Sequence, residues 1–537
     1  MFDDGSDRVS APSLRPPLHN TSSPRDKEPV GFEKLLKWQD ERRARKLKGE
    51  YESAVTHLSE VINGNLDAPL RISAVRVEGA TGTRASFLSS LIDPALSSSS
   101  SPPTLKSVLH TTRSLSSTLQ STGLFSSLTC TLVPPTSPTS SLSPSSPSPI
   151  PEVDLLIKAR ERGKYFLSSS TEIGNAEGTA SAVARVRNVF GGAETFEANV
   201  SMGTKTRRAF RATLSAPVVL GGRLGTVGEV GVYGMERDLT SYASCMEGLR
   251  GARASLKHTT PHGTHELAYD FVSRHIANLA PSASLSMRHA AGPSLKSAVS
   301  HTFVHDTRDD RLAGTRGFFL KTTSELAGRG GWLGGDAQHV KLEVEGQVSR
   351  RVASLAGVGT SHGGDGAEGG QSWWKSLALS LSWRSGVLWS LRGEEGGNGK
   401  EKTLFSDRFQ LGGPTSVRGF VANGMGPRDG DDSLGGTVYY AAGASVTGNI
   451  PGKPHWPVKT HLWANAGRLD VLDQSNQPST QPPTLTRLAQ PALSAGLGLV
   501  YRLDPVRVEV NFGMPLALSE GERGRRGVQV GVGVEFV

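Results

Sequence analysis

The sequence predicts an all-β membrane protein, in which a 16-stranded antiparallel transmembrane β-barrel (residues 163–537) follows one small α/β domain (residues 65–162). From Lys164 onward, one segment after another alternates apolar and polar residues with period two, which is typical of strands with one apolar face. No run of about 18 apolar residues is present, so no transmembrane helix is expected. A mean hydropathy of −0.28 still permits a barrel, because only alternate residues of a barrel strand face lipid.

The alternation is clearest in the last segment, residues 526–537. Its apolar face holds Val528, Val530, Val532, Val534 and Phe536, and its other face holds Gln529, Gly531, Gly533 and Glu535. Residues 505–514, 339–348 and 377–383 repeat the pattern. Either a soluble sandwich or a membrane barrel produces such strands. The number of strands, and lengths of about 10 residues that suit a tilted bilayer crossing, favour the barrel.

The strand count depends on one segment. Counting residues 281–290 as part of a long connection leaves 16 strands, and an even count places both ends of the barrel domain on the same side of the membrane. The longest connection, about residues 392–435, is polar and rich in glycine.

The N-terminal part is more varied. Residues 1–30 are predicted to be disordered and residues 31–64 helical, with the basic run at 42–48 facing either solvent or an anionic surface. The α/β domain is expected to have strands at 70–77, 128–133 and 153–159 and helices at 84–95 and 104–121, with a Pro/Ser insertion at 134–151. The first residues lack an apolar signal segment, so entry into an organelle from the cytosol is expected.

Composition excludes several functions. The net charge of +9 comes without an aromatic-basic motif, so nucleic acid is not an expected partner. Cys130 and Cys245 are far apart and form no CxxC pair. His258, His262 and His265 straddle a Pro/Gly turn, and Tyr269 stands where a zincin would need its second histidine. We therefore expect no metal, no cofactor and no catalytic residue, and hence no enzyme.

The longest connection contains the most specific motif, LGGPTSVRGF. Its residues Leu411, Gly412 and Gly413 lead into the tetrapeptide Val417, Arg418, Gly419 and Phe420. An arginine offers five donors in a planar fork and can tie a loop to a barrel wall. This run resembles the loop of the outer-membrane POTRA–barrel assembly superfamily that folds back into the barrel with a (V/I)RG(F/Y) tip. The resemblance implies that Arg418 meets an acidic residue in an F-x-D-x-G frame, but here that frame reads WANAG and offers Asn465. Either Asn465 or another carboxylate of the wall must accept from Arg418.

Two further segments fit the same family. Asp306, Arg308, Asp309, Arg316 and Gly317 resemble the family's DTRD…RG junction between two barrel strands, although the usual proline is missing. The C-terminus resembles the signal of mitochondrial barrel proteins, polar-x-Gly-x-x-hydrophobic-x-hydrophobic, with Gln529, Gly531, Val534 and Phe536 at its positions.

The α/β unit resembles a single POTRA domain, and one such domain without a signal peptide resembles the mitochondrial sorting and assembly branch of the superfamily. This implies an insertase that passes β-barrel precursors into the mitochondrial outer membrane through a lateral gate between the first and last strands. Its partners would be those precursors, accessory subunits and lipids, and the POTRA domain and C-terminus would both face the intermembrane space. A protein-translocating or solute-conducting pore is the alternative.

Overall fold

The computed structural model describes most of the chain. The described residues are 32–47, 59, 61–97, 103–135, 150–174, 177–220, 223–311, 314–328, 333–355, 376–391, 403–453, 456–472, 484–503, 506–519 and 521–533. The predicted disorder at 1–30 and most of the Pro/Ser insertion at 134–151 lie outside them. So do Val534 and Phe536 of the proposed C-terminal signal.

The N-terminal part begins with helix α1 (Phe32–Leu47), and the α/β unit follows. This unit runs β1 (Arg71–Glu78), α3 (Ala85–Ser97), α4 (Leu105–Ser121), β2 (Phe125–Val133) and β3 (Glu152–Glu161). Its sheet has the order β1-β3-β2, with β1 parallel and β2 antiparallel to β3. Apolar residues of both helices, including Leu91 and Leu119, pack with Leu155 and Ile157 of β3 into one core. The β-α-α-β-β order is the one predicted from the sequence.

The start of α4 shows how local sequence sets an element boundary. Thr104 accepts a hydrogen bond from the backbone N–H of Ser107, and the Ser107 hydroxyl accepts one from the backbone N–H of Thr104. This capping box satisfies two donors that the first helical turn would otherwise leave without partners.

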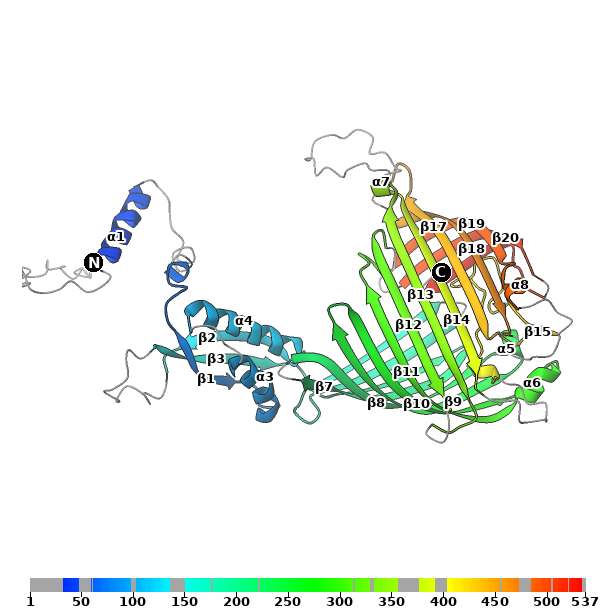
Figure 1. Ribbon diagram of the computed structural model, residues 1–537, viewed down its shortest axis with the longest axis horizontal. Coiled ribbons are helices and arrows are strands. Elements are labelled where there is room, and N and C mark those ends of the chain that lie inside the picture. Colours follow the sequence, from blue (N-terminus) through cyan, green and yellow to red (C-terminus); the bar gives the residue numbers. More distant parts are fainter. Residues whose placement is uncertain are drawn as a thin grey trace, which may run out of the picture.

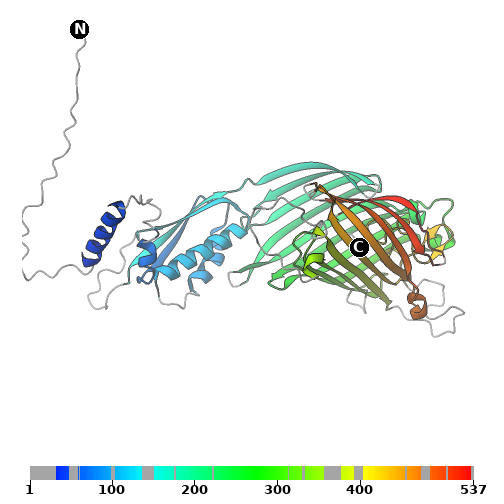
Figure 2. The same cartoon turned by 90° about the horizontal axis from the view of Figure 1, so that it is seen from above.

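In the described residues from Tyr165 onward, 16 strands form one antiparallel sheet that curls into a barrel (Figures 1 and 2). Its strands are β4 (Tyr165–Gly174), β5 (Glu177–Arg187), β6 (Thr195–Gly203), β7 (Thr206–Leu220), β8 (Arg223–Asp238), β9 (Met246–Thr260), β10 (Gly263–Ala277), β11 (Gly292–Asp306), β12 (Gly317–Ala327), β13 (His339–Arg351), β14 (Ala378–Ser390), β17 (Val438–Asn449), β18 (Val458–Asp470), β19 (Ala492–Leu503), β20 (Val506–Ala517) and β21 (Gly527–Gly533). Each strand pairs with the next strand of the barrel in sequence order. The predicted fold and strand count are confirmed, and residues 281–290 lie in a connection that holds the short helix α6 (Leu285–Ala290).

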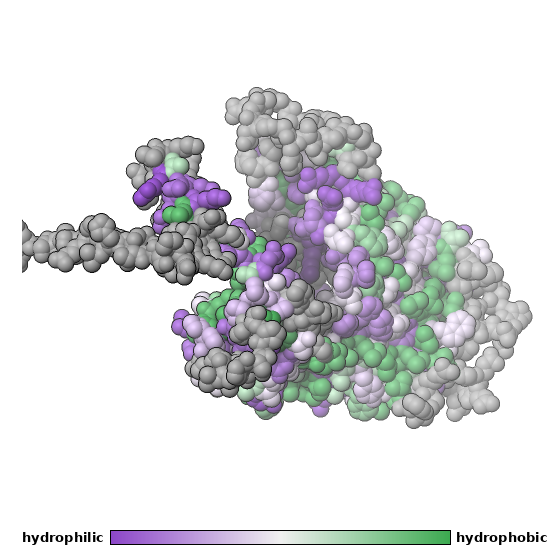
Figure 3. All heavy atoms as spheres, turned by 60° about the vertical axis from the view of Figure 1, so that its left-hand side comes forward, coloured by the Kyte–Doolittle hydropathy of each residue, from purple (hydrophilic) through white to green (hydrophobic). Residues whose placement is uncertain are grey.

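The two faces of the sheet differ as the alternation predicts. Leu462 on β18 and Leu497 on β19 are each 61% exposed on the outer face, where they meet lipid, whereas their neighbours His461 and Trp463 are buried inside. Figure 3 shows hydrophobic residues gathered on the outside of the barrel and hydrophilic residues toward its interior. Among the described residues, no helix is both long and apolar enough to cross a membrane.

The sheet has two ends, β4 and β21. Among the described residues no strand ladder joins them, since β4 pairs with β5 and β21 pairs with β20. Tyr165 and Leu167 of β4 are 82% and 79% exposed. Because the sheet has an even number of antiparallel strands, β4 begins and β21 ends at the same end of the barrel.

The α/β unit lies beside one end of the barrel (Figure 1) and contacts it at the turn between β5 and β6. The backbone N–H of Arg84 donates to the carbonyl of Gly191 (2.8 Å), and its guanidinium pairs with Glu194 (2.7 Å). From the same turn, Asn188 donates to the carbonyl of Gly82 (3.0 Å). These contacts fix one end of the α/β unit on the barrel rim.

This contact is expected to depend on pH through Glu194. Burial raises the pKa of this carboxyl, but hydrogen bonds from the Gly192 and Phe190 backbone and the charge of Arg84 outweigh it and lower the pKa below its ordinary value. A carboxyl with a lowered pKa stabilises the contact above its unfolded-state pKa, and that stabilisation is lost as the pH falls through the lowered value. The protection factors of the amides at residues 80–84, which compare the observed exchange with the intrinsic rate at each pH, should therefore fall below about pH 4.5 in the wild type. In Glu194→Gln they should already be low at neutral pH, and a variant with the same pH profile of protection as the wild type would contradict the assignment.

Candidate functional site: the lumen loop and its anchors

The connection between β14 and β17 folds back into the barrel. Its described part, residues 403–437, contains the short helix η2 (Phe405–Asp407) and a two-stranded hairpin of β15 (Arg428–Asp429) and β16 (Asp432–Ser433). Apolar loop residues pack with Leu388, Leu469 and Ala492 of the wall. Those loop residues are Phe409, Leu411, Val417, Phe420 and Met425. We call residues 403–437 the lumen loop and residues 417–420 its tip.

The tip needs glycine at position 419. Gly419 has a φ of +81°, in the left-handed region, and a Cβ there would lie 2.8 Å from the Cβ of Ser494 on β19. Gly419→Ala combines that contact with a backbone penalty of about 1–2 kcal/mol. We expect it to lower the free energy of unfolding in urea by about 2 kcal/mol or more.

A control in the same loop separates the two causes. Gly430 also has a positive φ, +60°, but a Cβ there would meet nothing within 4 Å. Gly430→Ala should therefore show the backbone penalty alone. Equal losses in the two variants would mean that the tip is not packed tightly against β19.

Arg418 forms the main polar contact between the tip and the wall. Arg418 is only 2% exposed. Its Nη2 and Nε lie 2.9 and 3.0 Å, respectively, from Oε2 of Glu509 on β20. Its Nη1 also donates to the Asn465 side-chain oxygen at 3.4 Å, and its guanidinium lies 5.7 Å from the centre of the Trp463 ring. The carboxylate that accepts from Arg418 is thus Glu509, whereas Asn465 supplies a longer, neutral contact.

Glu509 is held by more than Arg418. Arg507, two residues earlier on the same face of β20, pairs with its second oxygen (2.5 Å). Asn511, two residues later, donates to Oε2 (2.7 Å), and its side-chain oxygen accepts from Nδ1 of His461 on β18 (3.1 Å). A buried carboxylate is tolerated only when it is paired and hydrogen-bonded, and these neighbours meet that condition.

The tip is also fastened to the last strand. The side chain of Gln529 on β21 accepts from the Gly419 backbone N–H (2.9 Å) and donates to the Phe420 carbonyl (2.9 Å). Backbone bonds join the tip to the connection between β20 and β21, from Arg525 to Gly419 (2.8 Å) and from Val421 to Arg523 (3.0 Å). The tip therefore contacts the three C-terminal strands of the barrel.

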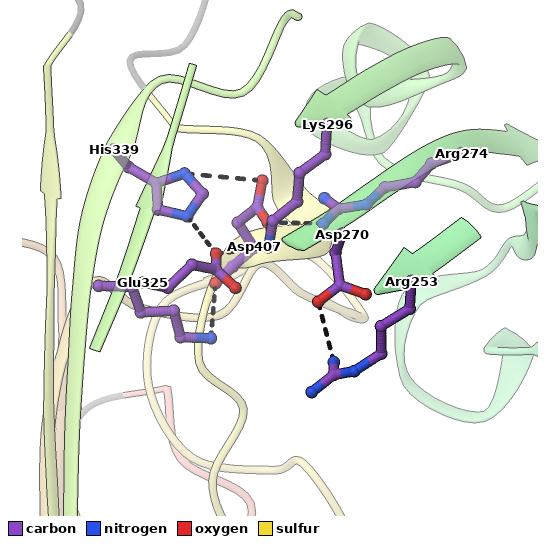
Figure 4. A network of polar contacts seen from close by, with 8 residues as sticks. Arg253, Asp270, Arg274, Lys296, Glu325, His339 and Asp407 are labelled. Carbon is purple, nitrogen blue, oxygen red and sulfur yellow. Dashed lines mark hydrogen bonds and ion pairs between the residues drawn. The ribbon is translucent and has the colours of Figure 1, made fainter. Parts of the chain in front are cut away.

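A second anchor holds the start of the lumen loop to β10 and β11 (Figure 4). Asp407 is buried and pairs with Arg274 of β10 (2.8 Å) and Lys296 of β11 (3.2 Å). Lys296 also pairs with Glu325 of β12 (2.5 Å), which contacts His339 of β13 (2.8 Å). Four consecutive strands thus converge on one loop carboxylate.

Glu325, His339 and Asp407 could in principle hold a metal ion, because their ligand atoms lie within 4.8 Å of one another. The ammonium of Lys296, however, already contacts both carboxylates, and Arg274 pairs with Asp407. Two cations balance two anions, so a divalent ion would have to displace a buried lysine. We assign the group as a structural ion-pair network.

The residues of the DTRD segment come together at the turn between β11 and β12. Arg308 pairs with Asp306 (2.9 Å), donates to Gln347 (2.7 Å) and stacks over Phe319. Asp309 accepts from the backbone N–H groups of Thr315 (2.9 Å) and Arg316 (3.1 Å). These bonds close the turn at the rim, and Gly317 follows with a φ of +119°.

The histidines near the turn between β9 and β10 do not converge. His258 bonds to Thr226 (2.8 Å), His265 lies beside His301 (3.3 Å), and the carbonyl of His262 contacts His305.

Fold and lumen loop together define a transmembrane β-barrel that carries an α/β domain and an inward-folded loop with an anchored arginine. The family model of the Omp85 superfamily domain matches residues 188–536. A SAM50-like protein of Schizosaccharomyces pombe is 34% identical over 488 residues, which cover 90% of this chain and 95% of that protein. The sorting and assembly machinery component 50 homolog of Xenopus tropicalis is 31% identical over 392 residues, covering 72% and 76%. The chain therefore belongs to the Omp85 superfamily, and within it to the SAM50 group of barrel subunits.

Solved structures give the same fold. The crystal structure of BamA from Haemophilus ducreyi lacking POTRA domains 1–3 is similar, with a TM-score of 0.64, over 87% of this chain and 84% of that one. The sequence identity is 14%, so the likeness concerns the fold.

Proposed function

We propose that the protein is an assembly factor that inserts β-barrel precursors into the mitochondrial outer membrane, and that precursors enter between β4 and β21. Its relatives are named as components of a sorting and assembly machinery, which supports a role in barrel assembly rather than an enzymatic one. The observation that carries the route is that no strand ladder pairs β4 with β21 among the described residues.

The physical reason for this route lies in the backbone. A strand cannot enter lipid with unpaired N–H and C=O groups, because each unpaired group costs several kcal/mol there. When the junction opens, the strand edge of β4 or β21 offers those partners while the precursor crosses. The exposed Tyr165 and Leu167 flank this edge and present apolar side chains to the same environment.

The lumen loop argues against the alternative of an open pore. Its tip and its start are anchored on opposite parts of the wall through Arg418 and Asp407, so the loop crosses the interior. We assign it the role of keeping the barrel in shape while the junction opens. The partners we propose are precursor polypeptides, accessory subunits and membrane lipids.

Depletion tests this function. When the protein is depleted, newly imported barrel precursors should fail to reach their folded, protease-resistant form, while helical outer-membrane proteins still insert. Normal barrel assembly together with the loss of a stable ion conductance would favour the pore instead.

We also propose that the α/β domain and the C-terminus face the intermembrane space. In intact mitochondria an external protease should spare an epitope placed after residue 537 and one placed in the α/β domain. Rupture of the outer membrane should expose both. Cleavage of either epitope in intact organelles would contradict this orientation.

A further inference from the structure

The outer face of β7, β8, β9 and β10 carries a boundary between apolar and charged residues. The register of these strands sets their outward side chains in rows that run across the face. Val232 and Phe271 of one row are 51% and 44% exposed, as expected for side chains that meet hydrocarbon. That row is apolar in all four strands and consists of Ala212, Val232, Ala252 and Phe271.

Charged side chains begin in the next two rows, at the end of the barrel away from the α/β unit. β6 leads away from the turn that contacts this unit, and β7 begins where β6 ends. Arg250 of β9 lies two residues from Ala252 on the same face, and the following row holds Arg208, Glu236 and His275. Arg208 pairs with Glu236 at 3.2 Å, so the one acidic side chain of these rows already has a partner. Arg250 has no ion pair among the described residues.

A groove of about 450 Å³ opens in the charged rows. It includes Gly248 of β9, where a Cβ would meet only the backbone oxygen of His275, at 3.8 Å. Arg250 and His275 line the groove beside this glycine. Phe210 lines it on the side of the apolar row, and its ring lies where a Cβ at Gly234 would be. The groove therefore has a cationic part at its outer end and an apolar part toward the middle of the membrane.

We propose that this groove binds an anionic phospholipid, with the phosphate between Arg250 and His275 and one acyl chain over Phe210. An arginine fork binds phosphate oxygens through two hydrogen bonds, and basic pockets at the membrane surface suit anionic headgroups. A zwitterionic lipid would need an acidic partner for its ammonium group, and Glu236 is already paired with Arg208. The inference requires only that the barrel spans a membrane, and it does not rest on the route by which precursors enter.

The test measures lipid binding to the full-length protein by native mass spectrometry. The probes are phosphatidylglycerol and phosphatidylcholine with identical acyl chains, which share the phosphate and differ in net charge. The first phosphatidylglycerol should bind about fivefold more tightly, because the choline ammonium would face Arg250 and one pair of charges at a surface is worth about that factor.

Two variants place the bound lipid in the groove. Arg250→Gln should lower the affinity for phosphatidylglycerol about tenfold, as expected for the loss of a charge-assisted hydrogen bond, and should abolish the preference over phosphatidylcholine. Gly248→Leu fills the groove and should weaken the binding of both lipids. Arg113→Gln, on α4, is the control for the charge. Gly228→Leu is the control for the added side chain, because a Cβ there would meet its nearest atom, on Val218, only at 3.8 Å on the same outer face.

Equal affinity of the wild type for the two lipids would mean that the groove takes acyl chains without reading the headgroup, and it would overturn the proposal. Unchanged phosphatidylglycerol binding in Arg250→Gln, or equal losses in Gly248→Leu and Gly228→Leu, would also overturn it. Normal lipid binding in Gly248→Leu together with the loss of a bound subunit would assign the groove to a protein partner instead. The comparison of the two lipids on the wild-type protein holds even if a variant fails to fold.

Discussion

Arg418→Ala is expected to release the tip and to destabilise the barrel by about 3 kcal/mol, because it removes one partner of a buried ion pair. Glu509 keeps Arg507 and Asn511, which limits the loss. Urea unfolding in liposomes gives the free energy, and hydrogen exchange at residues 411–425 reports whether the tip leaves the wall. We expect assembly of new barrels to fall in parallel with the loss of protection at the tip.

Controls assign this effect to the pair. Arg418→Lys keeps the charge but not the planar fork, so it should recover only part of the loss. Glu509→Gln combined with Arg418→Ala should cost less than the sum of the two single changes, since the residues share one interaction. Arg113→Ala, at an exposed position on α4, should change stability by less than about 0.5 kcal/mol. Additive losses at 418 and 509 would show that the two side chains do not form the anchor.

Asp407→Asn is the change with the second-largest expected effect. It removes the carboxylate that pairs with both Arg274 and Lys296, leaving Lys296 its pair with Glu325, and the loss of one partner of a buried ion pair costs about 3 kcal/mol. The start of the lumen loop should detach from β10 and β11, so that protease cuts the loop near residue 405 in the folded barrel. Asp93→Asn, at an exposed position on α3, is the matched control and should leave the loop protected. An Asp407→Asn protein that resists protease as the wild type does would mean that the network does not hold the loop.

Sequence periodicity predicts the barrel because every second residue of a barrel strand faces the same environment, either lipid or the lumen. Lipid on one side and a polar lumen on the other demand the same alternation in each strand, so Val528 and Val530 are exposed while Gln529 between them is buried. The α/β unit is predictable for a similar reason, since the helices α3 and α4 bury regular apolar faces against β3.

The anchors are not predictable in this way. Glu509 and Arg418 are 91 residues apart, and their meeting depends on the path of the lumen loop, which has no periodic pattern. The resemblance directs attention to Asn465 on β18, yet the carboxylate lies on β20, and from sequence Glu509 is only one of several polar-face residues. Asp407 is separated from Arg274 by 133 residues, and the register of four strands decides which lumen residues surround it. A charge on an inward-facing position, such as Lys296 between Ser294 and Ala298 on the same face of β11, is the one sequence signal that could have pointed to this network.

The most direct test of the central claim is a disulfide that closes the junction between β4 and β21. In a background of Cys130→Ser and Cys245→Ala, cysteine pairs are placed with one member in residues 165–171 and the other in residues 528–532, and pairs that oxidise are selected. The oxidised protein should lose insertion of barrel precursors, and a reductant should restore it, while single-cysteine variants stay active under both conditions. Undiminished insertion with the junction covalently closed would contradict the account.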